Sequence, residues 1–214
     1  MTRPADSSPA PPSAPEGRER PPSAGDPGVA GNERLTALAG AVLLVLIVAE
    51  VATVPRIRGL ISLHIFVGVM LAGPLAVKTA STGWRFIRYY TRNPAYRHKG
   101  PPSPFLRVLA PLLLIATLVE IGSGIALVST RPGSVGALLA VHHAGFLVFT
   151  VLVIIHGLAY IRRVPGLIAS DWRHDREQQA PGRTQRVAVN LAALLLGALA
   201  ALLVLPAFDA WIHW

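Results

Sequence analysis

One apolar stretch, Gly136 to Arg162, constrains this chain more than any other part of it. A membrane-spanning helix needs about 20 apolar residues, and this stretch is long enough, yet it contains His142, His143 and His156. An ionisable side chain inside a span is costly and indicates a functional site by default. On a helix with ~100° and 1.5 Å per residue, His142 and His156 lie about 40° and about 21 Å apart. The stretch therefore predicts one helix with an imidazole near each membrane surface.

The composition indicates a membrane protein throughout. The chain is 52% hydrophobic and 14% charged, whereas about a quarter of the residues of a soluble domain are charged. It contains no cysteine, which excludes disulfides, cysteine-ligated iron–sulfur clusters and covalent c-type haem attachment. The net charge of +9 does not indicate nucleic acid, because the arginines lie between apolar stretches, as the positive-inside rule expects.

The hydropathy pattern predicts an all-α, polytopic membrane protein with five transmembrane helices, and the histidines of the second and fourth spans indicate that these helices include a four-helix haem-binding-type bundle. Residues 1–33 are rich in Pro, Ser, Ala and Gly and are expected to form a disordered cytoplasmic tail. Residues 34–208 are the expected transmembrane domain, and residues 209–214 are a short outer tail. The expected spans are about 35–54, 60–79, 105–129, 136–162 and 187–205, with a turn at Pro55–Gly59 between the first two.

The distribution of basic residues predicts the topology. The loops after the second and fourth spans, 81–104 and 162–186, carry eleven Lys and Arg, whereas the loops after the first and third carry three. The positive-inside rule then places the N-terminus in the cytoplasm and the C-terminus outside the cell membrane.

The second span supplies a partner for the fourth. Both spans run inward, with His64 about five residues below the start of its span and His142 about six residues below the start of its own. At 1.5 Å per residue these depths agree within one helical turn. A b-type haem takes two axial imidazoles from facing helices. Gly68 and Gly145 lie one turn below the two histidines, where a missing side chain would let a flat macrocycle approach the backbone.

The inner end of this pair of helices has a lysine where a second haem would need a histidine. Lys78 follows His64 at the same spacing that separates His142 from His156. We interpret Lys78 as snorkelling to the cytoplasmic surface or pairing with an anionic group. Ligation by its deprotonated amine is the alternative.

These residues resemble those of membrane-bound b-type cytochromes, a group that includes the cytochrome subunits of formate dehydrogenases and nickel–iron hydrogenases, bacterial cytochrome b561 proteins and ferric-reductase-like domains. The resemblance covers roughly residues 35–165 and depends on His64 and the pair His142/His156. It implies a fourth helix that ligates two haems, and electron transfer between quinone and a partner oxidoreductase. Two departures, Lys78 and the absence of histidine at the start of the first span, favour one haem b over two.

Several assignments stay open at this stage. His143 is the alternative outer ligand, since the rotation of the helix is unknown. Glu120 is either a proton carrier near an outer quinol site or a hydrogen-bond partner of a neighbouring helix. Glu50 is interpreted as solvated near the interface, and Trp211 with Trp214 as interface anchors.

The leading hypothesis is an electron-transfer subunit, rather than a stand-alone enzyme, that lies in the lipid bilayer and holds haem between the second and fourth helices. The candidate iron ligands are His64, His142 and His156. One alternative is a cofactor-free transporter or proton-path protein whose buried ionisable residues line a polar path. Another is a membrane-anchored interaction protein that recognises partners through its Pro-rich tail.

Overall fold

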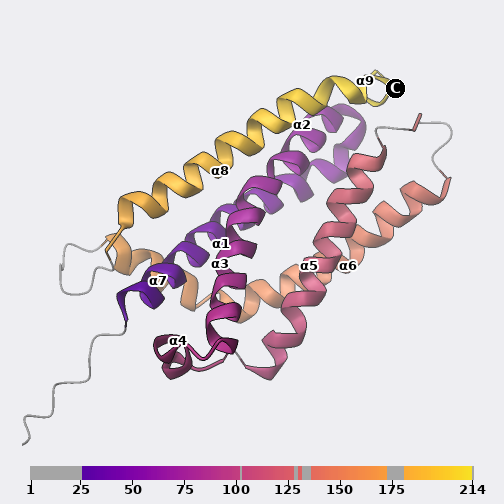
Figure 1. Ribbon diagram of the computed structural model, residues 1–214. Helices are drawn as coiled ribbons and strands as arrows, with labels where there is room; N and C mark the ends of the chain where they lie inside the picture. Colours follow the sequence, from indigo (N-terminus) through magenta and orange to yellow (C-terminus); the bar gives the residue numbers. More distant parts are fainter. Residues whose placement is uncertain (1–25, 102, 128–129, 132–135, 173–180, 214) are drawn as a thin grey trace, which may run out of the picture.

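The computed structural model describes residues 26–101, 103–127, 130–131, 136–172 and 181–213, and every regular element in these ranges is helical. Figure 1 shows the arrangement. The helices are α1 (Pro27–Thr53), η1 (Val54–Arg56), α2 (Ile57–Met70), α3 (Ala72–Tyr90), α4 (Pro94–Lys99), α5 (Pro104–Ala126), α6 (Gly136–Tyr160), α7 (Arg163–Trp172), α8 (Arg183–Val204), η3 (Leu205–Phe208) and α9 (Asp209–Ile212).

Four helical segments of the described chain are long and apolar enough to cross a membrane: Pro27–Tyr90, Pro104–Ala126, Gly136–Tyr160 and Arg183–Ile212. Most of their large apolar side chains are exposed on the outside of the bundle. This is the distribution expected of helices surrounded by lipid, because lipid tails are as apolar as the side chains that face them.

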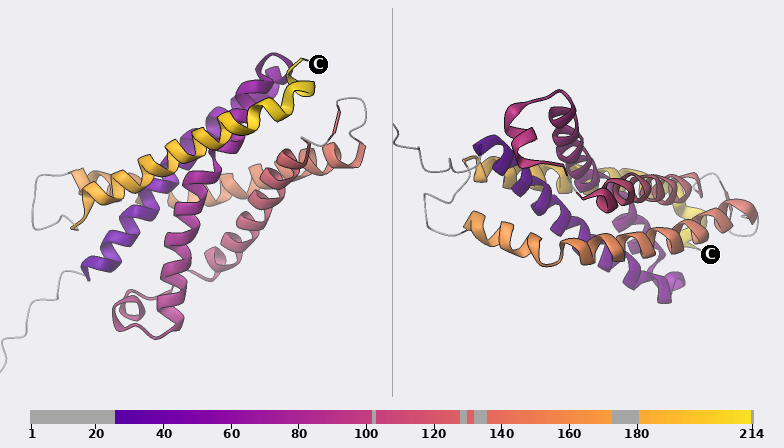
Figure 2. Two further views of the ribbon diagram at one scale, coloured as in Figure 1. Left: turned by 45° about the horizontal axis from the view of Figure 1, so that its top comes forward. Right: turned by 90° about the horizontal axis from the view of Figure 1, so that it is seen from below.

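The first of these segments folds back on itself. Pro55 opens the short helix η1, and both Arg56 (φ −126°, ψ 34°) and Leu60 (φ −124°, ψ 16°) leave the helical region. The chain therefore reverses near the expected turn, and α1 packs against α2 and α3 (Figure 2). Further along, Pro74 lacks the N–H that would bond the carbonyl of Met70, so the hydrogen-bond ladder between α2 and α3 is interrupted.

Helix α8 crosses α2 and α3 through a row of small residues. Ala193, Gly197 and Ala201 are spaced four apart on α8 and all are buried. A Cβ added at Gly197 would collide with the carbonyl oxygen of Met70, and one at Gly73 would collide with the carbonyl oxygen of Ala193. Small residues that allow helix backbones to approach closely are typical of packing between membrane helices.

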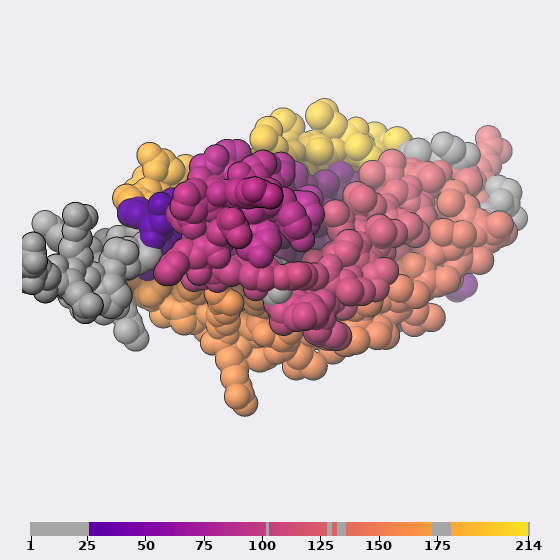
Figure 3. Space-filling view, turned by 60° about the horizontal axis from the view of Figure 1, so that its bottom comes forward, coloured from indigo at the N-terminus to yellow at the C-terminus, as the bar shows by residue number. Residues whose placement is uncertain are grey.

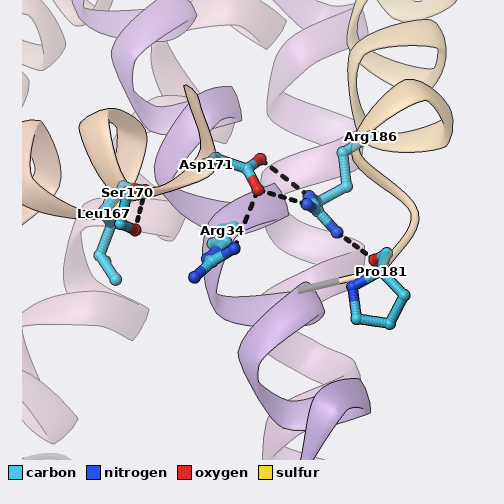
Figure 4. Close-up of polar contacts among 6 residues, drawn as sticks. All are labelled: Arg34, Leu167, Ser170, Asp171, Pro181 and Arg186. Carbon is cyan, nitrogen blue, oxygen red and sulfur yellow. Dashed lines mark hydrogen bonds and ion pairs between the residues drawn. The ribbon is translucent and has the colours of Figure 1, made fainter. Parts of the chain in front are cut away.

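Ion pairs hold one end of the bundle, which we call the basic end: the starts of α1 and α8 together with α4 and α7. Asp171 of α7 pairs with Arg34 of α1 at 3.0 Å and also with Arg186 of α8, and Asp171 and Arg186 are both buried (Figure 4). Glu33 of α1 pairs with Lys99 at 2.9 Å and also with Arg163. These contacts fix α7 across the start of α1.

The opposite end, called the C-terminal end, contains the reversal between α1 and α2, the end of α5 and the chain's last helices. Its core consists of Ile65, Leu127, Phe208 and Trp211. The indole N–H of Trp211 donates to the carbonyls of Leu127 and Thr130, each at 3.1 Å. Trp211 is therefore a buried cap on α5 and not the interface anchor that its sequence position predicted, while Trp214 lies outside the described residues.

Several expected loop boundaries need correction. Residues 1–25 lie outside the described range, but residues 27–33, expected to be part of a disordered tail, are the first turns of α1. The carboxylate of Asp26 caps this helix by accepting from the N–H groups of Gly28 and Val29, and Pro27 occupies its first position. Of the two expected inner loops, 81–104 contains the end of α3 and all of α4, and 162–186 contains α7.

Candidate functional site

A cavity of about 1650 Å³ lies between α1, α2 and α3 on one side and α5 and α6 on the other. Helices α5 and α6 pack mainly against each other, and α5 meets the rest of the bundle chiefly at α2. Figure 3 looks onto the side where the surface is hollowed between α3 and α5. The lining is mostly apolar, and the cavity exceeds the ~300–1,000 Å³ of typical small-molecule sites.

Two histidines face each other in this cavity. His64 of α2 and His142 of α6 have ring centroids 6.4 Å apart, with an angle of 87° between the ring planes. Both side chains are largely buried, with 21% and 17% of their surface exposed. The two residues that were expected to lie at matching depths are therefore brought together.

A hydroxyl group contacts the Nδ1 atom of each of these rings. Thr53 Oγ1 donates to the carbonyl of Glu50 at 2.6 Å and lies 2.8 Å from His64 Nδ1. In the same way, Ser123 Oγ donates to the carbonyl of Glu120 at 3.1 Å and lies 3.0 Å from His142 Nδ1.

These hydroxyl contacts favour one tautomer of both rings. A hydroxyl has a single proton, and in Thr53 and Ser123 it is directed to a backbone carbonyl. The oxygen can then accept from the imidazole, which favours the tautomer with the proton on Nδ1 in both His64 and His142. A neutral imidazole with its proton on Nδ1 has its lone pair on Nε2. Both rings thus have Nε2 available as a metal ligand.

A carboxylate joins each hydroxyl at the same nitrogen. Glu50 Oε1 lies 3.1 Å from His64 Nδ1, and Glu120 Oε1 lies 3.3 Å from His142 Nδ1. Both carboxylates are largely buried, each with 16% of its side chain exposed. The solvated position expected for Glu50 is wrong, because the reversal after α1 brings its side chain against α2. Glu120 contacts His142 of a neighbouring helix at ion-pair distance, and its two expected roles, as a proton carrier and as a hydrogen-bond partner, stay predictions.

Gly68 and Gly145 make room for these carboxylates. A Cβ built at Gly68 would lie 3.0 Å from Glu50 Oε1, and one at Gly145 would lie 2.7 Å from Glu120 Oε2. Glycine at each position therefore lets a glutamate lie directly against the backbone. The sequence interpretation reserved this space for a macrocycle, and the structure fills it with a side chain.

The residues present fit an iron ion with two axial imidazoles. With metal–nitrogen bonds of about 2.0 Å, two imidazoles on opposite sides of one iron have ring centres about 6.3 Å apart. The observed 6.4 Å matches this separation. The apolar cavity beside the pair also offers the environment that a porphyrin requires.

The other expected ligands lie elsewhere. His143 also lines the cavity but is exposed, and the ring that faces His64 is that of His142. His156 lines the cavity about 21 Å further along α6 than His142, with its ring 5.0 Å from that of Tyr160 and its Nδ1 buried without a hydrogen-bond partner among the described residues. Lys78 also lines the cavity, and its Nζ lies over Gly40 of α1.

In the described ranges no group of three or more His, Cys, Asp or Glu side chains is arranged to hold a bare metal ion.

The glutamate and hydroxyl residues beside the two histidines share a short sequence pattern. This pattern was not used in the prediction of the site. Glu50-Val-Ala-Thr53 and Glu120-Ile-Gly-Ser123 both read E-x-x-[ST], and each lies close to the end of the helix before its histidine helix. The carboxylate and the hydroxyl are one turn apart, so both reach the same ring nitrogen. Glu33-Arg-Leu-Thr36 also has this pattern, so the pattern becomes informative only where a helix with a histidine follows it.

Comparison with known proteins adds no relative: no family model, no curated protein and no solved structure matches this chain.

Proposed function

We propose that this protein is an integral membrane, b-type cytochrome-like electron-transfer protein that binds haem b between α2 and α6. The observation that carries the proposal is the facing pair His64 and His142, with ring centroids 6.4 Å apart in an apolar cavity. Haem bound at this position would supply a one-electron carrier.

The chain's own residues have distinct roles in this proposal. His64 and His142 would hold the iron through Nε2, and the hydroxyls of Thr53 and Ser123 favour the Nδ1–H tautomer that leaves Nε2 free. The apolar lining excludes water, which limits side reactions of the carrier. Since the chain has no nucleotide-binding motif, quinone and a partner oxidoreductase are the proposed sources and acceptors of electrons.

We further propose that the chain crosses the cell membrane five times. A single span of 64 residues would be about 96 Å long, three times the hydrocarbon core. The reversal after α1 instead divides that segment into two crossings, α1 and the α2–α3 pair. The concentration of arginines at the basic end favours a cytoplasmic basic end and an outer C-terminal end.

Spectroscopy of the purified protein tests the proposal directly. The protein would be produced in haem-supplied cells, purified in detergent and measured as a dithionite-reduced minus oxidised spectrum. We expect a b-type α band and bound haem by pyridine haemochrome assay. The absence of both would overturn the proposal in favour of a cofactor-free protein in which the same polar groups line a path.

Two substitutions and a matched control identify the ligands. His64→Ala and His142→Ala should each abolish the band, because each removes one axial nitrogen. His143→Ala should retain it, since His143 is adjacent in sequence but exposed. Loss of the band in His143→Ala together with its retention in His142→Ala would assign the ligand to the other histidine.

A further inference from the structure

We infer that Glu50 and Glu120 are a matched pair of positioning residues that lower the reduction potential of the iron held by His64 and His142. This inference depends on the proposed haem site and adds to it a role for two side chains that do not touch the iron. The argument comes from three features of the pair: their contacts, their burial and their repetition.

The contacts place a carboxylate oxygen on the protonated nitrogen of each ligand. Because the hydroxyls of Thr53 and Ser123 direct their protons to backbone carbonyls, Nδ1–H donates to the hydroxyl oxygen in each ring, and a carboxylate oxygen lies at ion-pair distance from the same nitrogen. Glu50 Oε1 and Glu120 Oε1 lie 3.1 and 3.3 Å from these nitrogens. Carboxylates in this position behind a metal-ligating histidine fix the ring and increase its basicity.

Because these carboxylates are buried, their electrostatic effect on the iron is larger than that of charges on the surface. Glu50 Oε2 and Glu120 Oε2 are buried and have no hydrogen-bond partner in the described part of the chain. A buried carboxylate without a full set of partners is costly unless positive charge lies nearby. Iron held by the two histidines would provide that charge, and the ferric ion would provide one unit more than the ferrous ion. The pair therefore favours the oxidised state.

The repetition argues against a purely structural origin. The same unit occurs twice, with a Glu and a hydroxyl one turn apart on the first helix, and a histidine followed by a glycine on the second. The first copy comes from α1 and α2, and the second from α5 and α6. Packing alone would not require a carboxylate and a hydroxyl to converge on the same nitrogen of both rings.

The experiment is a redox titration of the haem-loaded protein in detergent, followed at the α band. We expect Glu50→Gln and Glu120→Gln to keep the haem and to raise the midpoint potential, with a larger rise in the double variant, because the amide keeps the size of the side chain but removes its charge. Glu50→Asp should lie nearer the wild type. Asp209→Asn is the control: it removes a carboxylate from an exposed Asp209–His213 pair and should leave the potential unchanged.

The outcomes separate this inference from the haem proposal. Midpoint potentials equal to the wild type in both Gln variants would overturn the inference while the haem site stands. Wild-type protein without haem would overturn the haem proposal itself. If the Gln variants do not accumulate, Gly145→Ala displaces Glu120 without changing it, and Gly157→Ala, with open space around its Cβ, is the control on the same helix. A wild-type potential in Gly145→Ala would then overturn the inference.

Discussion

The crossing of α8 over α2 and α3 provides the sharpest test of the fold. A Cβ at Gly197 would lie 3.2 Å from the carbonyl carbon of Met70, 3.3 Å from its Cα, and closer still to its carbonyl oxygen. All three are backbone atoms, so no side chain can rotate to relieve the collision. Gly197→Ala must therefore force α8 away from the α2–α3 junction.

The size of the effect follows from these contacts. Ordinary carbon contacts are about 3.5–4.0 Å, so the helices must separate by roughly 1 Å, and a gap of 0.5–1 Å already loses a quarter to a half of each contact's attraction. Overpacking of this kind costs about 1–3 kcal/mol. Alanine in place of a helical glycine by itself stabilises the folded state by about 0.5–1 kcal/mol. We expect a net loss of about 1–2 kcal/mol in the free energy of unfolding.

Reversible unfolding in mixed micelles, followed by circular dichroism, measures this quantity. Gly83→Ala in α3 is the matched control, because open space surrounds its Cβ. The control should be unchanged or more stable by up to about 1 kcal/mol. Equal stability of Gly197→Ala and Gly83→Ala would refute the close crossing and with it this packing of α8.

Three further predictions concern the two ends of the bundle and the inner part of the cavity. Asp171→Ala leaves Arg186 buried without its carboxylate and should cost about 3–5 kcal/mol in the free energy of unfolding in the same assay. Trp211→Phe removes the N–H that donates to two carbonyls of the α5 end and should cost about 1–2 kcal/mol, measured in the same way. Lys78→Ala should leave the reduced-minus-oxidised spectrum unchanged, whereas a shifted or weakened α band would identify lysine as an iron ligand.

Sequence patterns predicted the features that depend on the length of a helix and on its rise per residue. Apolar length gave the positions of the helices, and counting 1.5 Å per residue brought His64 and His142 to the same depth. Features that depend on rotation and tertiary contact were not predictable in this way. His142 and His143 differ by ~100° on one helix, and only the orientation of α6 decides between them. Glu50 was misassigned because depth alone does not show that its helix turns it toward α2.

Short amphipathic elements were missed for a different reason. Helix α7 and the end of α3 contain arginines and aromatics that are typical of interfacial loops. Their helicity depends on partners elsewhere in the chain, such as the ion pairs of Asp171 with Arg34 and Arg186. Local patterns carry no information about such long-range pairs.

The inner part of the cavity is not a second copy of the outer site, although the 14-residue spacings match. Helix α6 is unbroken from His142 to His156, but the interruption at Pro74 lies between His64 and Lys78. The amine of Lys78 lies against α1 at Gly40. Neither Lys78 nor His156 has behind it the carboxylate and hydroxyl that hold the outer rings, and His156 Nδ1 has no hydrogen-bond partner among the described residues. A ring without such support has no fixed tautomer, so a single haem at the supported pair is the arrangement that we expect.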